Sequence, residues 1–123
     1  MKNKKILIVE DDKVTTSALV TKLKRCNFKT RIAGNGISGL NSIKNEKPDL
    51  IILDLLLPKM DGLEVLEKMK NNSSTKDIPV VILTNVERKK EEEISKKLGA
   101  TAYFVKTETS LDKVIEKIYK ILK

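Results

Sequence analysis

The chain has 123 residues, of which 40% are hydrophobic and 34% charged, and its formal net charge at pH 7 is +8. This length is typical of one compact domain that buries roughly two-thirds of its unfolded surface, so we expect a single domain over residues 1–123. The chain has no histidine and one cysteine, Cys26, which excludes an intramolecular disulfide and a Cys/His metal cluster. A reducing cytoplasm is the expected location.

The amino terminus is basic, but the apolar run after it, Ile6–Val9, ends at Glu10 and is too short for a signal peptide or a membrane span. The lysines are spread from Lys2 to Lys123 and interleaved with acidic residues, and aromatic residues make up 3% of the chain. This pattern is typical of a solvated surface. We therefore expect no direct contact with nucleic acid or with a membrane.

Short apolar runs alternate with longer segments that have helical spacing. In chain order, the expected strands are Ile6–Val9, Thr30–Ala33, Asp49–Leu53, Ile78–Leu83 and Ala102–Val105. The helical segments run from Val14 to Leu23, Ile37 to Ile43, Leu63 to Met69, Ile94 to Leu98 and Leu111 to Leu122. Turn and capping residues at these boundaries are Asn35-Gly36, Pro48, Pro79, Gly99 and Ser110.

A regular alternation of strand and helix predicts an α/β fold with a parallel sheet that is covered by helices on both faces, because parallel strands need crossover connections. The apolar run Ile51-Ile52-Leu53 is typical of a central strand buried on both sides. In such sheets ligands bind beyond the carboxyl ends of the strands. The residues at those ends are therefore the candidate site.

The strand ends carry a chemically related set of residues. Glu10 and Asp11 follow the first strand, Asp54 follows the third, Thr84 the fourth and Lys106 the fifth. Three carboxylates at one edge repel one another unless a cation lies among them, and an all-oxygen site is suited to Mg²⁺. A carboxylate can attack phosphorus, while the metal, a lysine and a hydroxyl hold the phosphoryl oxygens.

Each of these residues has an ordinary structural explanation when it is taken alone. Asp54 could form a turn, and the acidic run Glu10-Asp11-Asp12 could interact with a helix amino terminus. Thr84 could cap a strand end, and Lys106 could be one of many solvated lysines. Only the combination favours a phosphoryl site.

Four segments carry a family resemblance: residues 6–12 (ILIVEDD), 48–66 (PDLIILDLLLPKMDGLEVL), 78–84 (IPVVILT) and 98–106 (LGATAYFVK). With them the chain resembles, over essentially its whole length, the receiver domains of two-component response regulators, of the stand-alone type seen in chemotaxis regulators. The resemblance implies a doubly wound, flavodoxin-like (βα)5 fold with a five-stranded parallel sheet in the order 2-1-3-4-5.

The resemblance also implies roles for the carboxylates. Asp54 is the expected phospho-acceptor. Asp11, Asp54 and the backbone carbonyl of Leu56 are the expected Mg²⁺ ligands, with Glu10 helping through water. Asp12 is expected to be a neighbour of the site and not a ligand.

The remaining site residues follow from the same resemblance. Lys106 is the expected phosphate-binding lysine, Thr84 the switch hydroxyl, and Tyr103 the aromatic residue whose rotamer follows Thr84. Ordinary packing on an edge strand remains an alternative for Tyr103, because tyrosines commonly bury one face there.

The implied partners are proteins. The phosphoryl donor is expected to be a sensor histidine kinase, a histidine phosphotransfer protein or a small molecule such as acetyl phosphate. Phosphorylation is expected to change the affinity of the fourth helix, fifth strand and fifth helix for a downstream protein, in a monomer or a phosphorylation-dependent dimer. The last helix ends at Lys123, so we expect output through another protein if the chain is complete; a domain cut from a longer regulator would have the same sequence.

Four positions depart from the family pattern. Thr107 stands where proline usually follows the lysine, and a cis bond before a non-proline residue costs about 3–4 kcal/mol, so we expect a trans bond. Asn85 is larger than the usual residue after Thr84 and could narrow access for donors. Leu56 and Val86 are apolar where polar side chains can position hydrolytic water, which predicts slow autodephosphorylation.

Two rival functions differ in mechanism. A Mg²⁺-dependent phosphohydrolase with an aspartyl nucleophile needs an acid/base aspartate two positions after Asp54, and Leu56 is there. A degenerate receiver would act only as a binding module, which the complete set of five site residues disfavours. We therefore expect a protein that catalyses only its own phosphorylation and slow dephosphorylation.

Overall fold

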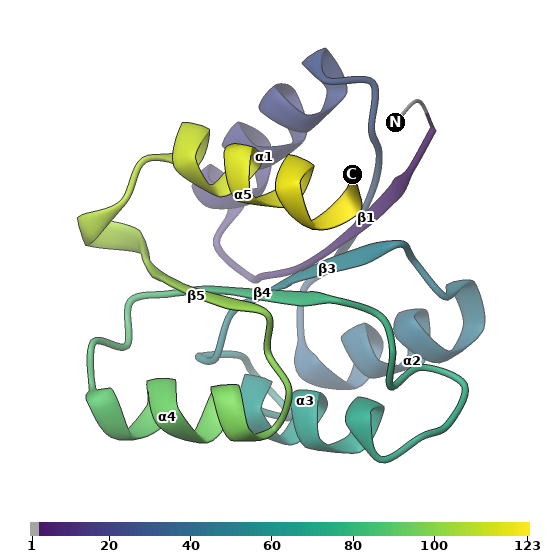
Figure 1. Ribbon diagram of the computed structural model, residues 1–123, viewed down its shortest axis with the longest axis vertical. Coiled ribbons are helices and arrows are strands. Elements are labelled where there is room, and N and C mark those ends of the chain that lie inside the picture. Colours follow the sequence, from purple (N-terminus) through teal and green to yellow (C-terminus); the bar gives the residue numbers. More distant parts are fainter. Residues whose placement is uncertain (1–2) are drawn as a thin grey trace.

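The computed structural model describes residues 3–123, and in this part of the chain five strands alternate with five α-helices (Figure 1). The strands are β1 (Lys5–Val9), β2 (Lys29–Ala33), β3 (Leu50–Leu53), β4 (Val80–Thr84) and β5 (Ala102–Val105). The helices are α1 (Lys13–Arg25), α2 (Gly36–Glu46), α3 (Gly62–Lys70), α4 (Lys89–Lys97) and α5 (Leu111–Leu122). A short 3-10 helix, η1 (Lys106–Glu108), lies in the connection between β5 and α5.

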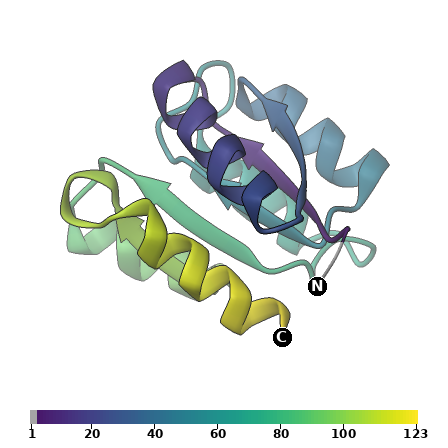
Figure 2. The ribbon, with the colours of Figure 1, turned by 90° about the horizontal axis from the view of Figure 1, so that it is seen from above.

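The strands form one parallel sheet in the order β2-β1-β3-β4-β5. Helices α1 and α5 cover one face of the sheet, and α2, α3 and α4 cover the other (Figures 1 and 2). The predicted doubly wound fold and its strand order are therefore confirmed.

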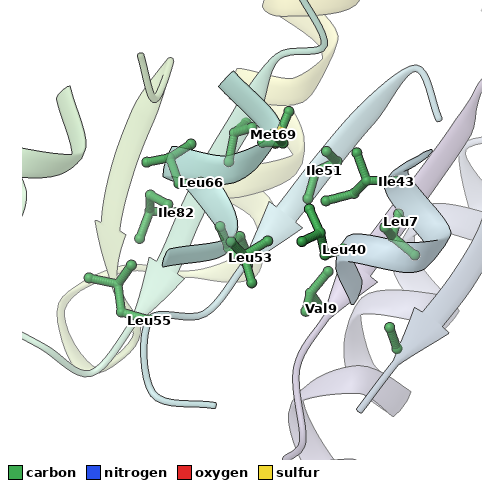
Figure 3. Close-up of a cluster of buried hydrophobic side chains, with 13 residues drawn as sticks. Leu7, Val9, Leu40, Ile43, Ile51, Leu53, Leu55, Leu66, Met69 and Ile82 are labelled. Atoms are coloured by element: carbon green, nitrogen blue, oxygen red, sulfur yellow. The ribbon is translucent and has the colours of Figure 1, made fainter. Parts of the chain in front are cut away.

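Alternation along each strand divides the buried side chains between two layers, because successive side chains of a strand point to opposite faces. On β1, Ile6 and Ile8 pack with α1 and α5, whereas Leu7 and Val9 pack with α2 and α3. Figure 3 shows the second layer, in which Leu40 and Ile43 of α2 lie over the sheet. The inner strands β3 and β4 are buried along their whole length, as the apolar run in β3 predicts.

Two strands begin later than predicted. Asp49 lies before β3, where its carboxylate accepts a hydrogen bond of 2.7 Å from the backbone N–H of Lys5. Ile78 lies before β4 because its N–H donates to the carbonyl of Thr75 in a turn, and the next residue, Pro79, has no N–H. Thr84 is the last residue of β4, whereas the prediction placed it just after the strand.

The helices begin at the edge of the sheet where the strands end. The side chains of Asp12, Asn35, Asp61 and Ser110 accept hydrogen bonds from backbone N–H groups in the first turns of α1, α2, α3 and α5. Asp12 is therefore a helix cap, which agrees with its predicted place outside the ligand set. Within residues 3–123, no helix combines the length and the apolar character needed to cross a membrane.

Candidate functional site

Three carboxylates converge at the carboxyl ends of two adjacent strands. Glu10 and Asp11 follow β1, and Asp54 follows β3, which pairs with β1 in the sheet. One oxygen from each carboxylate lies within 4.8 Å of the other two. Glu10 and Asp54 are 4% and 5% exposed, so their charges are poorly hydrated, whereas Asp11 is exposed. This all-oxygen donor set suits a hard divalent cation such as Mg²⁺.

Lys106 is the positive charge of this cluster. Its Nζ lies 2.5 Å from Oε1 of Glu10 and 3.2 Å from Oδ2 of Asp54. Burial by itself lowers the pKa of Lys106, but the contacts with the Glu10 and Asp54 carboxylates outweigh burial and raise this pKa above its ordinary value. The ammonium therefore stays charged between the two carboxylates.

Glu10 is held from two sides. One oxygen contacts Lys106, and the other accepts a hydrogen bond of 3.0 Å from the backbone N–H of Asp12. Burial raises the pKa of Glu10 above its ordinary value and the charge of Asp54 adds to this, although the bonds from Lys106 and Asp12 act in the opposite direction. A second cation near Glu10 would stabilise its ionised form.

The loop after β3 fixes Asp54. Oδ1 of Asp54 accepts a hydrogen bond of 3.1 Å from the N–H of Leu56. The backbone N–H of Asp54 donates to the carbonyl of Val9. Gly62 packs against this loop so closely that a Cβ atom there would lie 2.1 Å from the carbonyl oxygen of Asp54. Leu56 thus enters the site through its N–H, and its carbonyl as a metal ligand stays a prediction.

Val86, in the loop between β4 and α4, links the two predicted switch residues. The fully buried Thr84 accepts a hydrogen bond of 3.4 Å at Oγ1 from the N–H of Val86. Tyr103 donates its hydroxyl proton to the carbonyl of Val86 at 2.7 Å. Burial raises the pKa of the Tyr103 hydroxyl, and the charges of nearby carboxylates add to this, so the hydroxyl stays protonated and able to donate.

Thr107, which stands in the connection after β5 where the family usually has proline, affects both the peptide bond before it and a contact with the neighbouring loop. No peptide bond between described residues is cis, so the Lys106–Thr107 bond is trans, as predicted. The hydroxyl of Thr107 lies 3.3 Å from Oε1 of Glu87 and hydrogen bonds to it. This contact ties the connection that carries Lys106 to the loop that carries Val86.

The predicted residues therefore form two groups. Glu10, Asp11, Asp54 and Lys106 meet in one cluster, and Thr84 and Tyr103 meet at Val86. The linking role of Val86 was missed because it is carried by backbone atoms, which leave no mark in the residue type.

The sequence and the fold of this chain are similar to those of known proteins. Residues 6–119 match the family described as Response regulator receiver domain. The sporulation initiation phosphotransferase F of Bacillus subtilis (strain 168) is 34% identical over 122 residues, which cover 99% of this chain and 96% of that protein.

Other relatives are longer. The alkaline phosphatase synthesis transcriptional regulatory protein PhoP of Bacillus subtilis (strain 168) is 35% identical over 104 residues, which cover 85% of this chain but 42% of that protein. The crystal structure of a CheY-like response regulator receiver domain protein from Methanospirillum hungatei JF-1 superposes with a TM-score of 0.90 at 30% identity, covering 98% of this chain and 94% of that chain. This chain thus spans nearly all of some relatives and less than half of others.

Proposed function

This chain belongs to the response regulator receiver domain family, and on that basis we propose that it is a phosphorylation switch that accepts a phosphoryl group on Asp54. The observation that carries the proposal is the contact of Lys106 with Asp54, 3.2 Å, inside a cluster of three carboxylates. A phosphohistidine on a sensor histidine kinase or a histidine phosphotransfer protein is the proposed donor. Both are partners that receiver domains use.

In the proposed reaction, a carboxylate oxygen of Asp54 attacks the phosphorus atom. The phosphorus–nitrogen bond of the donor breaks, its electron pair stays on the imidazole, and an acyl phosphate forms on Asp54. Mg²⁺ held by Asp11 and Asp54, with the carbonyl of Leu56 and water-mediated help from Glu10, would neutralise charge on the phosphoryl oxygens. Lys106, already beside Asp54, would bind a further phosphoryl oxygen.

The proposed switch runs through Val86. A phosphoryl oxygen on Asp54 would attract the hydroxyl of Thr84, and a shift of Thr84 would disturb its bond to the Val86 N–H. Tyr103, which is bonded to the carbonyl of Val86, would respond. The face made by α4, β5 and α5 would then change its affinity for a downstream protein, in a monomer or a phosphorylation-dependent dimer.

We propose that the chain is not an enzyme toward other substrates. A phosphohydrolase with an aspartyl nucleophile needs an acid/base group two residues after it, and the apolar Leu56 fills that position. A cytoplasmic location and the absence of direct contacts with nucleic acid also stay predictions.

The proposal is tested by the intact mass of the protein after incubation with acetyl phosphate and Mg²⁺. We expect a gain of one phosphoryl group, and no gain when the metal is removed with a chelator. Because acetyl phosphate is one of several donors, the same measurement is repeated with a panel of phosphorylated histidine phosphotransfer proteins. No gain with any donor would overturn the proposal.

Removal of Mg²⁺ is expected to lower the thermal stability. A ligand that binds only the folded state stabilises the fold by about 1.4 kcal/mol when its free concentration is ten times its dissociation constant. For a domain of this size, this raises the midpoint temperature of thermal unfolding by roughly 5 °C. Asp11→Asn should abolish the increment, because it removes one negative charge from the cluster. Thermal denaturation with and without Mg²⁺ measures both, and an equal increment in the variant would exclude Asp11 as a ligand.

The phosphorylated form is expected to be long-lived. Leu56 is 60% exposed and Val86 is half-buried, and neither side chain can orient a water molecule for attack on the acyl phosphate. Leu56→Asn should therefore shorten the lifetime, on the order of tenfold if the amide acts as a water-positioning group. The decay of the phosphorylated mass after removal of the donor measures the lifetime, and a wild-type lifetime of seconds would contradict this prediction.

A further inference from the structure

A pocket lies over the amino-terminal halves of β1 and β2, beside the last turns of α2. Its volume is about 510 Å³, within the range of about 300–1,000 Å³ that is typical of small-molecule sites. Lys5, which lines the pocket, begins β1, whereas Glu10 follows the end of that strand. Because a strand rises about 3.3 Å per residue, roughly 16 Å separate the two residues. The pocket is therefore separate from the carboxylate cluster.

Three cationic side chains line the pocket from one face of the sheet. Lys5 of β1 is paired with Lys29 of β2, and two residues further on Leu7 is paired with Arg31. Side chains two residues apart on a strand share a face, as do side chains paired between strands. Leu7 packs in the layer under α2 and α3, so Lys5, Lys29 and Arg31 point to that side of the sheet. All three are exposed and accessible to a ligand.

The two lysines of this pocket have no carboxylate partner. Nε of Arg31 lies 3.1 Å from Oε1 of Glu46 in α2. Asp49 accepts its hydrogen bond from the backbone N–H of Lys5 and not from the ammonium. No ion pair of residues 3–123 includes Lys5 or Lys29. Like charges directly opposite each other on paired strands are unfavourable, so an anion between the two ammonium groups would be stabilised.

Protection of the sheet edge explains only part of this charge pattern. Basic side chains on an exposed edge strand discourage pairing with another chain, and Lys29 and Arg31 lie on the edge strand β2. Lys5 instead lies on β1, which is paired with β2 on one side and with β3 on the other. Its charge protects no edge, and it faces Lys29 at a cost that a bound anion would remove.

Polar groups of α2 complete the wall of the pocket. The half-buried Ser42 adds a hydroxyl group and the exposed Asn45 a carboxamide, and both groups can donate and accept hydrogen bonds. Glu46 neutralises one of the three cations, which leaves two positive charges in excess. A phosphate monoester carries about −1.5 to −2 charges at pH 7, and lysine is a common phosphate-binding residue. The charges and the polar groups thus match a phosphate ester that has hydroxyl groups on its body.

We propose that this pocket binds a small phosphate monoester whose body carries hydroxyl groups, such as a sugar phosphate or a nucleoside monophosphate. The phosphate group lies between Lys5 and Lys29, and the hydroxyl groups bond to Ser42 and Asn45. The proposal does not rest on the proposed function, because none of these residues belongs to the carboxylate cluster.

The test titrates ribose 5-phosphate and adenosine 5′-monophosphate into the protein, with a chelator present so that no metal bridges them to the carboxylates. Backbone amide NMR signals of Lys5, Lys29 and Asn45 are followed. We expect saturable shifts with at least one ester, and the tighter binder distinguishes a sugar phosphate from a nucleotide. Ribose and inorganic phosphate should bind at least roughly tenfold more weakly, because each lacks one set of contacts. No shifts with either ester, or equally tight binding of ribose or of inorganic phosphate, would overturn the proposal.

Lys29→Gln is expected to weaken binding of the ester roughly tenfold, because it removes one of the two opposed charges. Lys90→Gln, the same change at an exposed lysine of α4 outside the pocket, should leave the affinity unchanged. Lys29 is exposed and its charge opposes that of Lys5, so the variant should unfold at no lower urea concentration than the wild type.

Lys5→Gln is the second variant, with the same expected loss of affinity. An unchanged affinity in both pocket variants would exclude a phosphate group between the two lysines. An equal loss in Lys90→Gln would show that the ester is attracted only by the overall positive charge of the chain, which would also overturn the proposal.

Discussion

Asp54→Ala is expected to abolish the metal-dependent gain of one phosphoryl group. Asp54 is the carboxylate that contacts Lys106 at 3.2 Å and accepts the Leu56 N–H, so its removal leaves no nucleophile at the centre of the cluster. We expect the intact mass to stay at its starting value with acetyl phosphate and with protein donors. A drop of at least about a hundredfold in labelling is the scale expected when a nucleophile is removed.

The variant should remain folded, which separates loss of chemistry from loss of structure. Glu10 still pairs with Lys106, and removing the charge of Asp54 relieves part of the repulsion that raises the pKa of Glu10. Asp77→Ala is the matched control, because Asp77 is exposed and lies outside the carboxylate cluster. Labelling of Asp54→Ala at the wild-type rate would show that another residue accepts the phosphoryl group.

Gly62→Ala is expected to destabilise the fold by about 3 kcal/mol or more, at the upper end of overpacking substitutions. A Cβ at this position would lie 2.1 Å from the carbonyl oxygen of Asp54 and 2.6 Å from the Cα of Leu55. Both are backbone atoms of the loop that presents Asp54, so the clash cannot be relieved by rotating a side chain. The midpoint and slope of urea denaturation measure the change in the free energy of unfolding.

Gly34→Ala provides the control for this substitution. A Cβ at Gly34 would meet no heavy atom within 4 Å, and its φ lies outside the left-handed region, so the change should stay within about 0.5 kcal/mol. If Gly62→Ala were equally mild, the loop after Asp54 would be able to move away from α3. Such a loop would hold Asp54 loosely. The position of Asp54 beside Lys106 would then not be fixed before a phosphoryl donor binds.

Much of the fold could be predicted because its signals are local. The apolar run Ile51-Ile52-Leu53 marks a strand that is buried on both faces, and the capping residues Asn35 and Ser110 mark helix starts that the structure confirms. The exact starts of β3 and β4 could not be predicted, because Asp49 and Ile78 use their hydrogen bonds in contacts outside the ladders. An apolar or extended residue next to a strand does not reveal where the ladder begins.

The sequence by itself determined which residues stand at the strand ends, because a parallel sheet brings Glu10, Asp54 and Lys106 to one edge whatever their exact distances. Only the tertiary structure decided that Lys106 lies between Glu10 and Asp54, and that Val86 joins Thr84 to Tyr103. The physical reason is that a strand end is encoded locally by hydrophobic pattern, whereas side-chain distances and backbone hydrogen bonds between loops depend on how separate elements pack.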